Sequence, residues 1–373
     1  MPDDGTPLAI DAFRVPMDHT RDVSGLDALV WEGRLNPDDI VAVAGKTGGW
    51  GDNYDASRVD ADQAIRDFLR ENGTRPDAEV EAIPMAFSAG VGTIMTPHAV
   101  VFTRTPSEPA ADGLPRLALG SSASEEILPE WMLTPRHVEA NAGAVEAAAK
   151  DGGMSPADVE FVIGKSYYPP LADIASSRAA RGLPELSYQE IFRFSSGSIA
   201  HAVKATVEGT PLPEVSAIGT DRDQWSGRVA VSSNAWEGVG GEGPQTHLLA
   251  FGNTRGAGGR LRIGRAVVED LLDIGAVTRA VRDAGIEVGD GPLPPHVSSR
   301  IVATFLKYQE PAGGILRGRK LVTEDPAYIK NLKTVAASAF SAMLQDNMIW
   351  ISAGGFQQGP PGGGTLAIVL DVS

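Results

Sequence analysis

The sequence contains no cysteine among its 373 residues. This absence excludes disulfide bonds, thiolate zinc sites and a cysteine nucleophile. Basic residues are also in short supply, with 32 Lys and Arg against 48 Asp and Glu, which gives a net charge of −16. A general nucleic-acid binder needs a basic face, so this charge argues against such a partner.

Long apolar runs are missing as well. No run in the sequence approaches the ~20 apolar residues that a helix needs to span a bilayer. The opening stretch, MPDDGTPLAI, is acidic and differs from a signal peptide. We therefore expect a cytoplasmic protein with no membrane partner. Aromatic residues are few at 6%, whereas 43 glycines and 26 prolines favour a loop-rich fold over a helical bundle.

Three stretches of the chain share one arrangement around a serine. In each, a short β-rich run ends in a serine followed by small residues, and a loop and a second apolar run come next. The three serines are Ser88, Ser232 and Ser352. The pattern predicts a strand, a serine-bearing turn, a loop and a second strand in each stretch.

A lysine at the end of an earlier strand also recurs three times. Lys46 ends IVAVAGK, Lys165 ends VEFVIGK and Lys307 ends IVATFLK. A helical pattern lies between each lysine and its serine. Another helical pattern precedes each lysine and ends in a glycine, which is typical of a helix C-terminus.

Together these signals define a β-α-β-α-β-β unit that occurs three times. We predict an α/β (α+β) fold of three similar domains, at residues 1–106, 107–254 and 255–373. The domains are expected to surround a pseudo-threefold axis, with sheets inside and helices outside. The strand ends that carry the lysines and serines would then meet at one central cavity.

A serine hydroxyl becomes a nucleophile only when a base takes its proton. The six histidines show no repeat-equivalent position in the sequence, so lysine is the candidate base. Burial and neighbouring positive charges both lower the pKa of a lysine, and three lysines around one cavity would have this effect on one another. The small residues after the serines, Ala89, Ser233 and Ala353, would offer backbone N–H groups to an oxyanion.

Three segments are more specific than the repeat pattern. They are GKTGGWGDNYDASR at 45–58, LKYQEPAGGILRGRK at 306–320 and ISAGGFQQGPPGGGTLAIV at 351–369. In these segments the chain resembles the cyanuric acid hydrolase and barbiturase family, the ring-opening cyclic amide hydrolases. The resemblance extends over the whole length and is loosest in the middle domain. It implies three similar domains around one active site, each giving a Ser, a Lys and usually an Arg.

The resemblance implies that the middle pair does the chemistry, with Ser232 as nucleophile, Ser233 as its adjacent alternative, and Lys165 as base. The positions expected to bind substrate are Lys46, Arg58, Ser88, Ala89, Arg193, Ser233, Lys307, Lys330, Ser352 and Ala353. Lys330, or else Lys333, stands where the family has an arginine, whose planar bidentate contact a lysine cannot make. Gly48 and Phe356 replace two glutamates of the family, so the substrate can be a related ring.

The resemblance further implies a structural Mg, Ca or alkali ion at the C-terminal Gly/Pro loop, and no organic cofactor. Oxygen ligands suit such a hard cation, and the alternative is a metal-free turn. The matching positions are Gly355, Gln358, Pro360 and Gly362, with Glu310 as the nearest acid. The implied partners are a small planar heterocycle and further copies of the chain in a homotetramer.

Two functions follow from these observations. The first is ring-opening hydrolysis of a C–N amide bond in a small planar cyclic amide or imide by a Ser–Lys mechanism. The second is a non-hydrolytic or differently specific member of the same fold that binds a planar heterocycle. Retention of all three Lys/Ser pairs favours the first.

Three other motifs are set aside. GKT at 45–47 lacks the first glycine of a phosphate-binding loop, and the glycine pattern at 238–243 precedes a strand rather than a helix. The SSGS segment at 195–198 is expected at a helix start, as a capping sequence.

Overall fold

The computed structural model describes residues 7–49, 56–90, 94–234, 244–322 and 328–373. Within them, three four-stranded sheets share one strand order: the first, fourth, second and third strands of each repeat lie side by side. The second and third strands run parallel, and the other neighbours antiparallel.

The sheets contain, in spatial order, β1 (Leu8–Pro16), β4 (His98–Pro106), β2 (Ile40–Lys46) and β3 (Met85–Ser88); β5 (Arg116–Ala123), β8 (His247–Thr254), β6 (Val159–Tyr167) and β7 (Val229–Asn234); β9 (Leu261–Val268), β14 (Gly364–Asp371), β10 (Ile301–Tyr308) and β13 (Trp350–Ser352).

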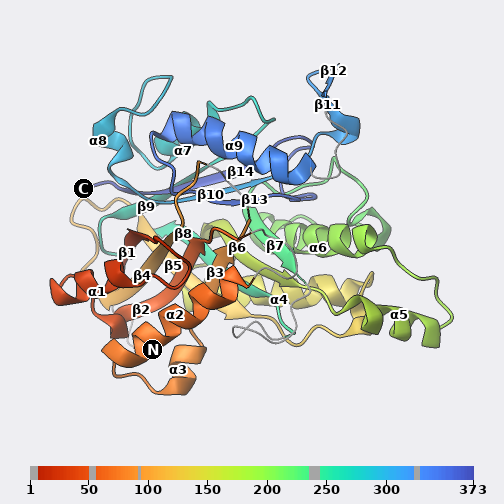
Figure 1. Ribbon diagram of the computed structural model, residues 1–373, viewed down its shortest axis with the longest axis horizontal. Coiled ribbons are helices and arrows are strands. Elements are labelled where there is room, and N and C mark those ends of the chain that lie inside the picture. Colours follow the sequence, from red (N-terminus) through yellow and green to blue (C-terminus); the bar gives the residue numbers. More distant parts are fainter. Residues whose placement is uncertain (1–6, 50–55, 91–93, 235–243, 323–327) are drawn as a thin grey trace.

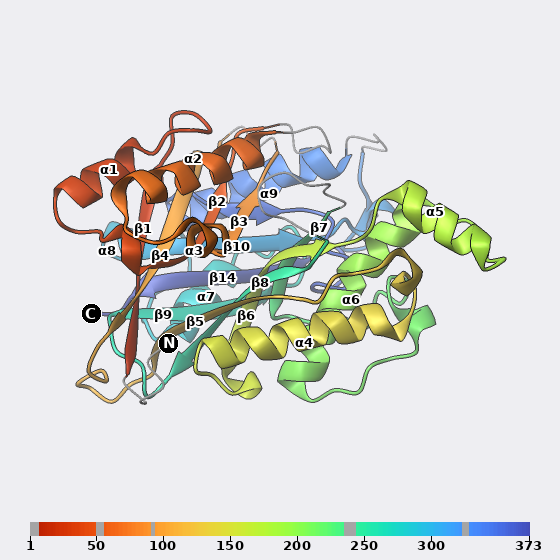
Figure 2. The same ribbon diagram turned by 90° about the horizontal axis from the view of Figure 1, so that it is seen from below.

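Helices lie around the outside of the strands in both views (Figures 1 and 2). They are α1 (Ser24–Trp31), α2 (Ser57–Asn72) and α3 (Asp77–Glu81); α4 (Pro135–Asp151), α5 (Leu171–Ala180) and α6 (Tyr188–Glu208); α7 (Ala276–Asp283), α8 (Pro295–Ser298) and α9 (Tyr328–Leu344). A small hairpin, β11 (Ile315–Leu316) and β12 (Arg319–Lys320), precedes α9. No helix of the described residues is long and apolar enough to cross a membrane.

The predicted glycines do end the helices that precede the lysine strands. Gly33, Gly153 and Gly285 follow α1, α4 and α7, with φ angles of 68°, 65° and 92°. Backbone in this left-handed region favours glycine, which has no Cβ to clash with the preceding turn.

The three sheets pack together through their inner faces. Side chains from all three, such as Ala44, Ile163 and Phe305, form one buried cluster, whereas three further clusters join each sheet to its own helices. Hydrogen bonds also cross between repeats: Trp350 Nε1 donates to Ala86 O, and Thr365 Oγ1 donates to Val229 O, each over 2.8 Å. The fold prediction, with sheets inside and helices outside, is therefore confirmed; the residue limits of the domains stay a prediction.

The prediction of one helix start was wrong. The 195–198 segment lies inside α6, which begins at Tyr188, and Ser187 and Glu190 form the capping box at its start. The buried hydroxyls of Ser195 and Ser196 bond to groups outside the helix, Ser166 Oγ and Phe356 O. These bonds let serines occupy the interior of a helix, where they are otherwise unfavourable.

Candidate active site

Each lysine lies directly opposite its serine on the neighbouring parallel strand. Lys46 pairs with Ser88, Lys165 with Ser232, and Lys307 with Ser352. The sequence predicted the three pairs, and the strand register places them at the same point of each repeat.

The alternation of side chains along the strands directs these residues to the inside. In β6, for example, Phe161 and Ile163 belong to the inner cluster, and Lys165 continues the same face. The same spacing holds for the other two lysines and for all three serines. The lysines are 1–4% exposed. The three lysines and three serines therefore lie together at one end of the shared inner core.

Direct hydrogen bonds join the second and third repeats at this layer. Ser232 Oγ lies 2.7 Å from Ser352 Oγ. Lys307 Nζ donates to Ser352 Oγ and to Ala353 O, both over 3.0 Å. A hydroxyl of one repeat is thus linked to an amine of the next.

The first repeat is tied to the third in the same region. Ser88 Oγ donates to Ile351 O over 2.5 Å. Lys333, on α9, donates from Nζ to Ala89 O over 2.8 Å. Lys46 Nζ donates within its own repeat, to Gly90 O at 2.6 Å and Thr47 O at 2.8 Å. Residues of all three repeats, Ser88, Ser232 and Ser352 among them, therefore lie in one region.

This arrangement disfavours the charged form of Lys307. Burial lowers the pKa of Lys307 well below its ordinary value, and the positive charges of Lys165 and Lys333 lower it further. A lysine in this setting can hold an uncharged amine, which is the form that accepts a proton.

The prediction that no histidines occupy equivalent positions in the repeats was wrong. His98 lies opposite Lys46 on β4, and His247 lies opposite Lys165 on β8, so these two histidines are repeat equivalents. Thr365 takes the corresponding place in the third repeat. Burial lowers the pKa of His98 to about 4, so this ring is uncharged at neutral pH. The register of strands separated by long loops could not be read from the sequence.

The structure distinguishes the two adjacent serines of the middle repeat by the face that each occupies. Ser232 lies two residues after Ala230, a member of the inner cluster, whereas Ser233 lies two residues after Val231, which packs toward the helices. Ser233 lies opposite Ser166 on β6, and its buried hydroxyl has no hydrogen-bond partner. Of these two serines, only Ser232 therefore shares the face of the lysines.

The two predicted arginines lie at the starts of helices or near them. Arg58 is in the first turn of α2, where Ser57 Oγ lies 2.8 Å from Thr47 Oγ at the end of the lysine strand. Arg193, on α6, lies over the ring of Phe356 with its Cζ 5.4 Å from the ring centre. Arg222, which the sequence did not single out, lies over the same ring at 5.3 Å. Phe356 thus packs against two guanidinium groups.

Of the two lysines proposed for the missing arginine, Lys333 reaches the centre through its bond to Ala89 O. Lys330 lies on α9, but its side chain falls outside the described residues. The two positions are about one helical turn apart, so the sequence alone left both open.

Comparison with known proteins identifies the family of the chain. Residues 11–371 match the model of a family described as amidohydrolase ring-opening protein. The chain belongs to this ring-opening amidohydrolase family.

Characterised relatives of the ring-opening amidohydrolase family match almost the whole chain. A barbiturase from Nocardioides sp. is 32% identical over 97% of this chain and 98% of its own. A cyclic amide hydrolase from Azorhizobium caulinodans is 33% identical over 97% and 100%. A solved cyanuric acid hydrolase, described as an evolutionary innovation by structural concatenation, has a TM-score of 0.85, with 29% identity over 98% and 100%.

The turn between β13 and β14 offers few free ligands for the metal that the family resemblance implies. Both ends of the Gln358 amide bond to Val231, and the carbonyls of Gly355 and Pro360 accept bonds within the turn. Arg222 donates to Glu310 O over 2.8 Å, which brings a positive charge beside the one acid of the set.

The described residues contain no group of three His, Cys, Asp or Glu that could hold a metal ion. The metal site that the resemblance implies would therefore depend on backbone carbonyls of the turn rather than on a cluster of such side chains. Metal binding at this turn stays a prediction, which elemental analysis of the purified protein tests.

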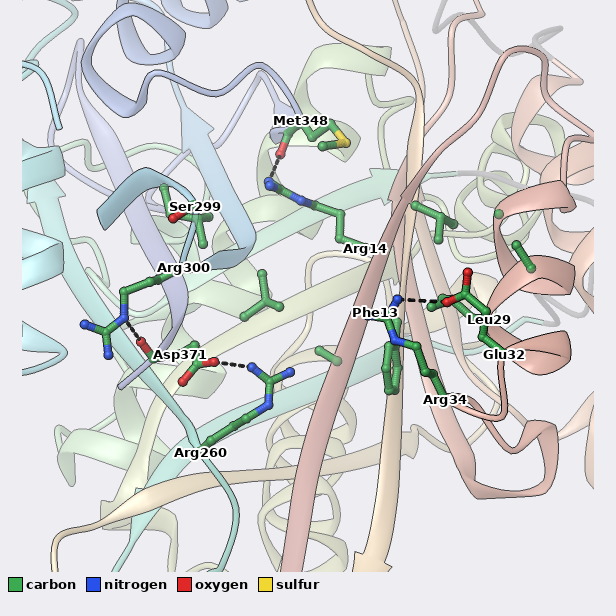
Figure 3. Close-up of a pocket in the computed structure, with 16 residues that line it drawn as sticks. Phe13, Arg14, Leu29, Glu32, Arg34, Arg260, Ser299, Arg300, Met348 and Asp371 are labelled. Atoms are coloured by element: carbon green, nitrogen blue, oxygen red, sulfur yellow. Dashed lines mark hydrogen bonds and ion pairs between the residues drawn. The ribbon is translucent and has the colours of Figure 1, made fainter. Parts of the chain in front are cut away.

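A cavity of about 500 Å³ lies between the first and third repeats, apart from the lysines and serines (Figure 3). Several arginines line it, and each already has a partner: Arg14 donates to Met348 O, Arg34 to Glu32, and Arg300 to Asp371 O. Each of these guanidinium groups thus already has an acceptor within the protein, and we assign this cavity no ligand.

Proposed function

We propose that this protein opens the ring of a small planar cyclic amide or imide, such as cyanuric acid, a barbiturate or a related ring, by hydrolysing a C–N amide bond. One observation carries the proposal: three in-register Lys/Ser pairs end the inner faces of three sheets that share one buried core, and hydrogen bonds connect their serine strands. The names of the relatives support the same class of substrate.

Ser232 is the nucleophile in this proposal. It shares the inner face with the lysines and lies at hydrogen-bond distance from a second serine. Attack of Ser232 Oγ on a ring carbonyl carbon forms an ester, and the break of the C–N bond opens the ring. Water then hydrolyses the ester and restores the serine. A lysine in uncharged form takes and returns the proton, and the family resemblance favours Lys165 for this task.

The remaining residues of the centre would bind the substrate. Weakly acidic rings in their anionic form would be attracted to the lysines of the centre. Ammonium groups, serine hydroxyls and the backbone N–H groups of Ala89 and Ala353 would stabilise the oxyanion. Lys333 would take the place of the family's arginine. It would act as a single positive charge, without the planar bidentate contact that a guanidinium makes.

The experiment is a panel of cyclic imides and ureas, with ring opening followed by the loss of ultraviolet absorbance. Turnover of at least one ring by the wild type, and its loss in S232A, supports the proposal. Tight binding of a ring without turnover would favour the non-hydrolytic alternative. Sedimentation of the same sample tests the proposed homotetramer.

A further inference from the structure

A continuous line of hydrogen bonds leads from the nucleophile of the second repeat to the amine of the third. Ser232 Oγ and Ser352 Oγ are 2.7 Å apart, and Lys307 Nζ is 3.0 Å from Ser352 Oγ. Both distances are short enough for proton transfer along a hydrogen bond. The line crosses the boundary between repeats, so neither Lys/Ser pair contains it alone.

The surroundings of Lys307 suit the accepting end of such a line. Its ammonium form is opposed by burial and by the charges of Lys165 and Lys333. Ala353 O accepts one N–H of Lys307, which fixes the direction of the amine. When Lys307 donates this N–H to Ala353 O, the lone pair of an uncharged Nζ can accept a hydrogen bond from the Ser352 hydroxyl.

Resting on the proposed function, we propose that Lys307 is the base for Ser232 and that Ser352 relays the proton between them. Ser352 Oγ accepts the proton of Ser232 and passes its own to Lys307 Nζ, which becomes an ammonium. At the same time a bond forms between Ser232 Oγ and the ring carbonyl carbon.

The return of the proton completes the step. Lys307 gives a proton to Ser352, and Ser352 gives one to the ring nitrogen as the C–N bond breaks. In deacylation, water attacks the ester carbon, its proton follows the same line to Lys307, and Ser232 Oγ leaves as the bond to carbon breaks and regains a proton through Ser352.

The relay gives the two neighbouring lysines different roles. Lys165 contributes a positive charge, which keeps Lys307 uncharged and stabilises the oxyanion on the ring carbonyl. The family resemblance favours Lys165 as the base, and the strand register places it opposite Ser232. The hydrogen-bond line from Ser232 leads to Lys307, the lysine of the neighbouring repeat.

The test measures acylation of Ser232 by p-nitrophenyl acetate, from nitrophenolate release and peptide mass spectrometry. This readout does not require a cyclic substrate. S352A is expected to acylate about 10²–10⁴-fold more slowly than the wild type. The matched control is S195A, which breaks another buried Ser–Ser contact, the 2.9 Å contact with Ser166 on the face of β6 opposite to Lys165; its rate should stay within about tenfold of the wild type.

Added alkylamines then identify the base. Rescue of K307A should rise with pH in proportion to the uncharged amine, whereas rescue of K165A should follow the alkylammonium. The reverse pattern, or an S352A rate equal to that of the S195A control, would overturn the relay. Acylation that depends on Ser352 and Lys307 in a protein that opens no ring would support the relay and overturn the proposed function.

Discussion

Ser232 Oγ lies 2.7 Å from Ser352 Oγ, although 120 residues separate the two serines in the chain. They come from equivalent strands of the second and third repeats. The contact exists because three sheets share one inner core, and the last inward position of each serine strand reaches the same centre. The candidate active site is therefore a product of packing between repeats.

The first prediction separates the two adjacent serines of the middle repeat. S232A should lose at least about 10³-fold in kcat/KM for ring opening, because the proposal makes the Ser232 hydroxyl the group that forms the ester. S233A should lose about tenfold or less, because Ser233 faces the helices. Steady-state kinetics on a ring from the panel gives the answer, and equal losses in both variants would contradict the assignment.

The second prediction concerns the charge of Lys333. Removal of this positive charge in K333M should raise the pKa of Lys307, because Lys333 disfavours the Lys307 ammonium. A base must be uncharged to act, so the acid limb of kcat/KM should move to higher pH, by about one pH unit. K333R keeps the charge and should leave the limb near its wild-type position. A limb that moves to lower pH in K333M would refute this account of Lys307.

The third prediction tests the contact between the first and third sheets. W350F removes the indole N–H that donates to Ala86 O, and leaves a buried carbonyl without this partner. The free energy of unfolding should fall by ~1–3 kcal/mol. Trp31 offers the matched control, since its side chain is 90% exposed and W31F should change stability by less than ~0.5 kcal/mol. Urea denaturation of the two variants compares them directly.

The fourth prediction is a loss of stability in weak acid. Burial lowers the pKa of His137 from 6.5 to about 4, and the ring packs edge-on against Phe194 with no hydrogen-bond partner at either nitrogen. Between pH 4 and pH 6.5 the unfolded chain binds a proton at His137 that the folded chain does not bind. The histidine should therefore cost ~2 kcal/mol of stability at pH 5 relative to pH 7.5.

His98 and His201 have pKa values lowered in the same direction and add to this loss. H137L should show a smaller difference in unfolding free energy between the two pH values than the wild type does. An equal pH dependence in both proteins would mean that His137 is already protonated in the fold.

The repeat pattern was visible in the sequence because each unit repeats the same local signals. A glycine in left-handed backbone ends the helix before each lysine strand, and a serine ends a short apolar strand. Period-two alternation then places Lys46 and Ser88 on the same face as the inner core. These local rules are enough to predict the fold and the meeting of the three pairs.

Other features depend on contacts that local rules do not contain. The pairing of His98 with Lys46 is set by the register of two antiparallel strands that lie far apart in the chain. The interior place of Ser196 in α6 depends on its bond to Phe356 O of another repeat. Arg222 was not singled out because its partners, among them Glu310 O, become neighbours only in the folded chain.

The most direct test of the account is the mass of the protein during turnover. Rapid acid quenching while a ring is being opened, followed by peptide mass spectrometry, locates the ring-opened acyl group. The account predicts this group on the peptide that contains Ser232. The same group on the peptide of Ser88 or Ser352 would contradict it.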